Sequence, residues 1–321
     1  MTICIAARLR PFSHTPGMSC VIPRTHSILT AFPTLLRIDA HDIPIPVTGP
    51  VRNFTLQQDL ERDSIFVFGK AKEGYFRLQV LANETSIQLI SEKGPVIRLE
   101  FPNSRYQPEA EMERLSLGSH KAQDWDLVKR RADLSEILPA LFFLGQKVPQ
   151  VTEETWKGTA ALLTLPDKRD NLEGALLALF QAGFADLLVP RLFDDQYQGF
   201  TSTEVVGGNP FFLLQRSAKI LRSLFFRQEG KVLSFLPFLP ISFHAGRMTH
   251  IQVPGVGVLD FEWSKKVLRR VQIQAHFCGE VGFQLQKEIQ SFRVNKERVL
   301  EKNEPLMLTK HTTYYLDRFQ K

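Results

Sequence analysis

The hydrophobic period of this 321-residue chain changes twice, and those changes constrain the fold more than any other feature. Up to about residue 108, apolar residues alternate in short runs, as they do in half-buried strands. From 109 to about 230 the spacing lengthens to that of helices, and after Gly230 the strand rhythm returns. We therefore expect three domains: an N-terminal antiparallel β-sandwich over 1–108, a helical domain over 109–230, and a C-terminal β-sandwich over 231–321.

Local signals place individual elements within these regions. N-terminal strands are predicted at 3–8, 35–40, 64–69, 75–81, 85–90 and 96–101, where short runs rich in β-branched and aromatic residues end at turn signals. Helices are predicted at 119–131, 133–145, 171–183 and 209–228, where capping residues precede helical periodicity. Later strands are predicted at 258–263 and 267–276.

The composition excludes several classes of protein. No apolar run reaches the ~18 to 20 residues that a bilayer crossing needs, so a membrane-spanning protein is not expected. The N-terminal apolar stretch precedes Arg8 and Arg10, which is the reverse of the order in a secretory signal. Cys4, Cys20 and Cys278 are widely scattered, which predicts neither a disulfide framework nor a zinc site. We expect a cytoplasmic protein.

Positive charge is concentrated in the last third of the chain. Residues 216–321 hold 18 basic and nine acidic residues, within a chain whose net charge is +6. These basic residues are spread singly along predicted strands and one helix, and only Lys265-Lys266 and Arg269-Arg270 cluster. Such a spread is typical of a solvated face, so nucleic-acid binding is disfavoured.

The familiar catalytic signatures are missing from the sequence. Gly207-Gly208 and Pro254-Gly-Val-Gly257 lack the residues that make a phosphate-binding loop. No pair of histidines has the helical spacing of a zinc protease, and no Gly-x-Ser-x-Gly segment is found. We therefore expect neither a cofactor nor a metal ion.

Carboxylates are the remaining candidates for chemistry. Hydrolysis of a glycosidic bond uses one protonated and one ionised carboxyl group. Asp124 and Asp126 flank Trp125, a ring that could stack on a sugar or anchor a helix in the core. The other candidates are Asp194, Asp195 and Glu204.

Residues 171–319 resemble the C-terminal part of the family 95 glycoside hydrolases, the α-L-fucosidase and α-L-galactosidase group. The resemblance rests on Arg191-Leu-Phe-Asp-Asp195, Val205-Val-Gly-Gly-Asn-Pro210, Val232-Leu-Ser-Phe-Leu-Pro-Phe-Leu-Pro240 and Val258-Leu-Asp-Phe-Glu-Trp263, which keep the family's order and spacing. It implies a β-sandwich, a central (α/α) barrel and a C-terminal β domain. It also implies a carbohydrate substrate, with Asn209 in the turn beside it.

The sequence departs from this family at the catalytic base. The family carries an acidic residue where this chain has Gly207, and glycine cannot accept a proton. The helical region is also too short for twelve helices of ~12 residues, so we expect a shortened barrel. A carboxylate from Glu204 would need a reshaped turn.

Two functions remain open at this stage. The first is a glycoside hydrolase that acts with Glu204 and one of the four aspartates. The second is a non-catalytic relative that binds a glycan or a protein partner, which Gly207 and the short helical region favour.

Overall fold

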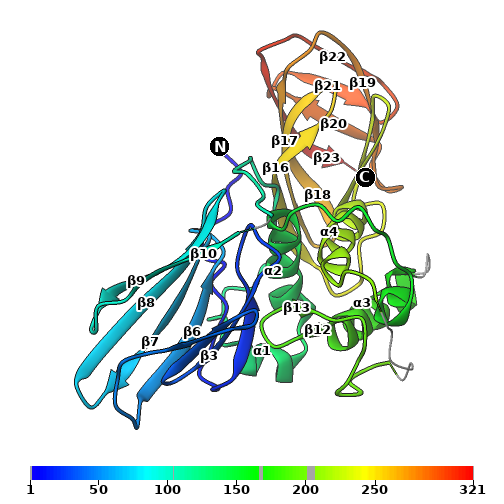
Figure 1. The fold of residues 1–321 in the computed structure, drawn as a ribbon. Coiled ribbons are helices and arrows are strands. Elements are labelled where there is room, and N and C mark those ends of the chain that lie inside the picture. The colour runs from blue at the N-terminus through cyan, green and yellow to red at the C-terminus, as the bar shows by residue number, and fades with distance from the viewer. Residues whose placement is uncertain (1, 104, 166–168, 201–206, 321) are drawn as a thin grey trace.

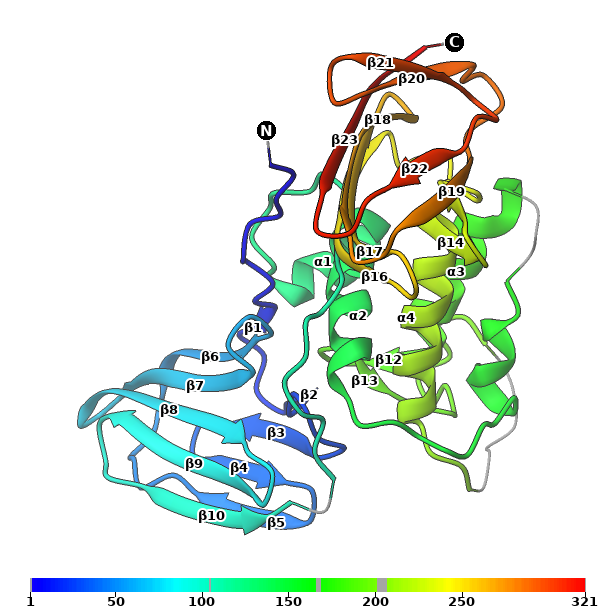
Figure 2. The ribbon, with the colours of Figure 1, turned by 90° about the horizontal axis from the view of Figure 1, so that it is seen from above.

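The computed structural model describes residues 2–103, 105–165, 169–200 and 207–320. In this part of the chain 41% of residues are in strands and 18% in helices. Two packed sheets are built from the N-terminal residues, and two more lie at the C-terminal end. The helices lie beside the N-terminal sheets on one side and against the C-terminal sheets on the other (Figures 1 and 2).

The N-terminal region consists of two antiparallel sheets that face each other (Figure 2). The first has the order β1-β6-β7-β8-β9-β10, with bounds Phe12–Ser13, Arg52–Asp59, Ser64–Ala71, Gly74–Ala82, Ser86–Lys93 and Arg98–Pro102. The second has the order β2-β3-β4-β5, with bounds Met18–Val21, Ile28–Phe32, Leu35–Ile38 and His41–Pro44. Buried residues such as Leu29, Leu56 and Leu78 form the core between them.

The predicted strand at 3–8 is wrong, since these residues form no strand. The segment is instead tied to side chains of other elements. The carbonyl of Cys4 accepts a hydrogen bond from Arg247 Nη1 at 3.1 Å, and the N–H of Leu9 donates to Glu61 Oε1 at 2.9 Å. A strand needs a neighbouring backbone ladder, which the alternating sequence alone does not supply.

The C-terminal region also contains two sheets. The larger has the order β11-β16-β17-β18-β23-β20-β21, with bounds Arg114–Ser116, Ala245–Val253, Gly257–Ser264, Val267–Ala275, Thr313–Gln320, Ser291–Val294 and Arg298–Glu301. The smaller has the order β14-β15-β19-β22, with bounds Phe226–Glu229, Val232–Phe235, Gly279–Gln284 and Leu306–Leu308. β15 and β19 run parallel, whereas the other pairs in these two sheets are antiparallel. A hairpin formed by β12, Phe184–Ala185, and β13, Val189–Pro190, lies among the helices.

The predicted central helical barrel is wrong. The helices of the described chain are α1, α2, η1, α3 and α4, with bounds Trp125–Arg131, Leu134–Lys147, Gly158–Leu163, Arg169–Gly183 and Phe211–Phe225. Nearly every residue of α2 is buried. Because α2 is buried on nearly all sides, it forms the interior of a packed layer and does not serve as one wall of a hollow ring.

Helices α2 and α4 approach each other closely at Gly145. A Cβ atom at this position would lie 2.3 Å from the carbonyl oxygen of Leu214 and 2.8 Å from Cβ of Ala218. Glycine therefore permits this contact, which fixes how the two long helices cross. Among the described residues, no helix has both the length and the apolar character that a membrane crossing requires.

Candidate functional site

Asp194 closes a loop that follows β13. The residue is 2% exposed, and its Oδ1 accepts a hydrogen bond from Arg191 Nη2 at 2.7 Å. Its Oδ2 accepts from the N–H groups of Gly199 and Phe200, both at 3.0 Å. Burial acts to raise the pKa of Asp194, but the backbone hydrogen bonds and the Arg191 charge outweigh it and lower that pKa. Asp195 is exposed and forms an ion pair with the same arginine. This loop therefore holds an ionised carboxylate whose oxygens are both occupied.

The residues around Trp125 also have structural partners. Asp124 is the N-cap of α1, accepting from the N–H of Leu127 at 3.3 Å. Asp126 accepts hydrogen bonds from Ser13 Oγ at 2.8 Å and Thr15 Oγ1 at 3.2 Å. Trp125 itself is fully buried and packs edge-on against Phe180, with ring centroids 6.2 Å apart. Its ring thus has no exposed face on which a sugar could stack.

The turn before α4 carries the remaining predicted residues. Asn209 Oδ1 accepts a hydrogen bond from the N–H of Phe211 at 3.0 Å, so the side chain serves the start of α4. Gly207 and Gly208 have φ of +85° and +98°, a region that favours glycine. A carboxylate residue at Gly207 would be strained in this backbone. Glu204 lies outside the described residues. Each described candidate carboxylate is thus engaged by a hydrogen bond or an ion pair within the fold.

A hollow of about 720 Å³ lies between α2 and α3, and we call it the α2–α3 hollow. Its lining comes from residues 117–121, 132–135, 173–177 and 242–245. The polar side chains that line it are Ser119, His120, Lys121, Asp133, Ser135, Glu173, Ser242 and His244. Hydroxyl, imidazole and carboxylate groups from four separate segments therefore meet at one concave surface, which sequence reasoning did not identify.

The two carboxylates of this hollow are engaged in hydrogen bonds. Asp133 is the N-cap of α2 and accepts from both the N–H and the Oγ of Ser135, at 2.9 and 2.7 Å. Burial acts to raise the pKa of Asp133, but these bonds and the nearby Lys121 charge outweigh it and lower that pKa. Glu173 Oε1 accepts from the N–H of Ser242 at 2.8 Å. Since a general acid must hold a proton, Asp133 is unsuited to that role.

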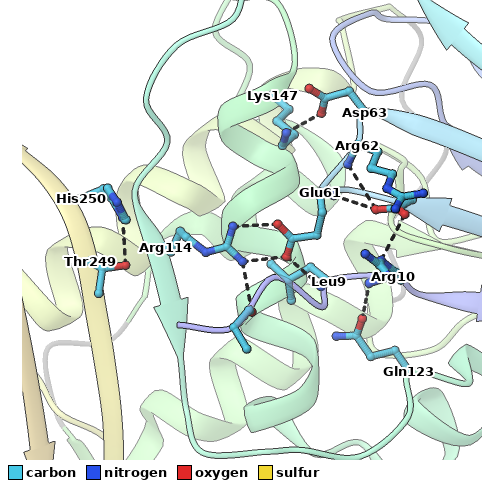
Figure 3. Close-up of polar contacts among 12 residues, drawn as sticks. Leu9, Arg10, Glu61, Arg62, Asp63, Arg114, Gln123, Lys147, Thr249 and His250 are labelled. Carbon is cyan, nitrogen blue, oxygen red and sulfur yellow. Dashed lines mark hydrogen bonds and ion pairs between the residues drawn. The ribbon is translucent and has the colours of Figure 1, made fainter. Parts of the chain in front are cut away.

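A buried network of charges joins the turn between β6 and β7 to β11 and α2 (Figure 3). Glu61, in the turn between β6 and β7, receives two hydrogen bonds from Arg114, at 2.6 and 2.7 Å. In the same turn Asp63 pairs with Lys147 of α2 and with Arg24. The ring of Phe143 lies 4.9 Å from the Arg114 guanidinium carbon and 4.6 Å from Lys147 Nζ. These charged side chains lie between the packed elements and hold them together. We call this set of ion pairs the structural joint.

The sequence signal for this joint was the acidic and basic turn Asp59-Leu-Glu-Arg-Asp63, which sequence reasoning missed. Three charged residues between two strands ordinarily lie in solvent, so the sequence alone favours an exposed turn.

Other binding chemistries find little support in the described residues. Within the described ranges, no cluster of three or more His, Cys, Asp or Glu side chains could hold a metal ion. Several C-terminal arginines are paired with acidic residues, namely Arg222 with Glu113, Arg247 and Arg270 with Glu262, and Arg293 with Asp317. These pairs reduce the positive surface that a phosphate backbone would require.

Comparison of the chain with protein-family models gives no match, and neither does comparison with curated proteins.

Proposed function

We propose that this chain binds a saccharide in the α2–α3 hollow and does not hydrolyse it. The observation that carries the proposal is the hollow itself, where two histidines, several hydroxyl groups and two carboxylates line about 720 Å³. Such groups donate and accept hydrogen bonds in many directions, as the hydroxyl groups of a sugar require. The sequence resemblance to family 95 glycoside hydrolases supports the same ligand class.

The non-hydrolysing part of the proposal rests on the carboxylates. A glycosidase needs two carboxyl groups in environments that move their pKa values apart. Asp133 has a lowered pKa and is the N-cap of α2. Glu173 accepts a hydrogen bond from the N–H of Ser242. Asp133 therefore lacks the raised pKa of a general acid, and the Glu173 carboxylate is already engaged by the backbone of Ser242.

The test compares ligand stabilisation of the full chain with that of a variant of the hollow. Defined hexasaccharides of glucose, xylose, mannose and galactose units serve as probes. At saturating concentration, one of them should raise the Tm of the wild-type chain by roughly 2–4 °C, because a ligand that binds only the folded state stabilises it. The double substitution His120→Ala, His244→Ala should abolish most of that shift. Both histidines are exposed, so their replacement should leave the fold intact.

His276→Ala provides the matched control, because His276 is also exposed but lies outside the hollow. It should retain the full shift in Tm. Release of reducing sugar in proportion to protein concentration would contradict the absence of hydrolysis. If no hexasaccharide stabilises the wild-type chain, the saccharide proposal fails and a protein partner becomes the better explanation.

A further inference from the structure

A second hollow, of about 580 Å³, lies on the polar face of the larger C-terminal sheet. It is lined by residues of β18, β23, the turn after β20 and the N-terminal segment, and we call it the sheet-face hollow. Gln272 of β18 and Tyr315 of β23 are direct cross-strand partners at its floor. Asp260 of β17 lies opposite Gln272 on the other side, so the three side chains form one row across three strands.

Gln272 is the unusual member of this row. Its side chain points to the polar face, yet the residue is only 7% exposed. Its Oε1 has no hydrogen-bond partner among the described residues. A buried acceptor without a partner is costly, and native structures generally supply one from the protein, water or a ligand. Gln272 Oε1 is therefore an acceptor that a ligand hydroxyl group at the hollow can satisfy.

Tyr315 and Ile3 give this hollow apolar surface. Tyr315 is 46% exposed, and its backbone is fixed by Asn295, whose Oδ1 accepts the N–H of Tyr315 at 2.9 Å. Ile3 is 4% exposed but lies outside the main hydrophobic core, and it lines the hollow together with Gln272. Ile3 thus contributes buried apolar surface to this hollow.

We infer that the sheet-face hollow is a second saccharide-binding site, in which a sugar ring stacks on Tyr315 and a sugar hydroxyl donates to Gln272 Oε1. A pyranose combines an apolar C–H face with a rim of hydroxyl donors, and this matches an exposed aromatic ring beside an unpaired amide oxygen. The amide of Asn295 and the hydroxyl of Thr313 lie at the same hollow and supply further polar contacts. This inference shares the ligand class of the proposed function but rests on separate residues.

The test is made in the full chain carrying His120→Ala and His244→Ala, so that the α2–α3 hollow no longer contributes. Binding of the same hexasaccharides is measured by isothermal titration calorimetry. Adding Tyr315→Ala should weaken the remaining binding roughly tenfold, since an aromatic contact of this kind is worth about one order of magnitude in affinity. Gln272→Leu, which keeps the size of the side chain, should weaken it to a similar degree.

Tyr75→Ala is the matched control, because Tyr75 is also a partly exposed tyrosine on a strand, at 40% exposure, but belongs to β8. It should leave binding unchanged. Equal affinity of the Tyr315→Ala variant and its parent, or equal loss in the Tyr75→Ala variant, would overturn the second site.

The two proposals can fail separately. Loss of all binding in the histidine variant would overturn the second site and leave the α2–α3 hollow as the binding site. Unchanged binding in the histidine variant, together with loss in Tyr315→Ala, would support the sheet-face hollow and overturn the proposed function of the α2–α3 hollow.

Discussion

Replacing Arg114 by methionine is expected to lower the free energy of unfolding by about 3 to 5 kcal/mol, because the substitution leaves a buried carboxylate without its cation. The side chains of Arg114 and Glu61 are 14% and 7% exposed, and two parallel hydrogen bonds join them. Chemical denaturation, followed by far-UV circular dichroism, measures the change. Arg37→Met is the control, since Arg37 and Asp42 form a similar two-bond pair in solvent. That control should change stability little. Equal effects of the two substitutions would contradict a structural role for the buried pair.

The same joint predicts how stability depends on pH. Burial acts to raise the pKa of Glu61, but hydrogen bonds from Arg114 and from the N–H of Leu9, together with the Arg114 charge, outweigh it and hold that pKa below its usual value. A carboxylate with a lower pKa in the folded state stabilises the protein above its unfolded pKa of ~4.3, and that stability is lost as the pH falls through the folded value. Stability should therefore fall on acidification below about pH 4, and less steeply in Glu61→Gln.

Replacing Trp125 by alanine is expected to cost about 3 to 5 kcal/mol of stability, because it empties a large fully buried site. Trp125 has no exposed surface and packs against Phe180 of α3. Thermal and denaturant unfolding measure the loss. Trp125→Phe should retain more stability than alanine, because it keeps a ring in the site and removes an indole Nε1 that has no hydrogen-bond partner among the described residues.

Trp156 provides the matched control for this substitution. It is 46% exposed, so Trp156→Ala should change stability far less than Trp125→Ala. A stable Trp125→Ala variant with impaired saccharide binding would show that this ring belongs to a ligand site and would contradict its placement in the core.

The sequence predicted where most N-terminal strands lie, but it did not predict which segments would pair with one another. Strands β7 to β10 follow from alternation and turn signals that lie within each segment. The segment 3–8 has similar alternation, but its polar contacts go to Arg247 and Arg114, more than 100 residues away in sequence. Periodicity indicates which side chains can be buried, but it does not indicate which other segment a strand will pair with.

The arrangement of the helices was misjudged for a related reason. Capping signals placed the helices at 133–145 and 171–183 near their observed positions, but the helix predicted at 119–131 begins only at Trp125, with Asp124 as its cap, and the helix predicted at 209–228 ends at Phe225. The barrel came only from the family resemblance. Residues 137–144 of α2 are continuously apolar, so this part of the helix has no polar side to face a central opening. That sequence feature was sufficient to argue against a ring of helices.

The functional residues were harder to predict because their roles depend on contacts between distant segments. Asp194 was nominated for its chemistry, yet its Oδ2 accepts hydrogen bonds from the N–H groups of Gly199 and Phe200. The α2–α3 hollow joins residues 117–121 to 242–245, and the sheet-face hollow joins Ile3 to Tyr315. No local pattern brings such segments together, so only the folded chain shows these surfaces.

The central claim, saccharide binding without cleavage in the α2–α3 hollow, is tested most directly by backbone hydrogen exchange with and without the stabilising hexasaccharide, followed by mass analysis of the recovered sugar. The account predicts slower exchange in residues 117–121 and 242–245 and recovery of the intact hexasaccharide. Unchanged exchange in both segments, or recovery of shortened sugars, would contradict it.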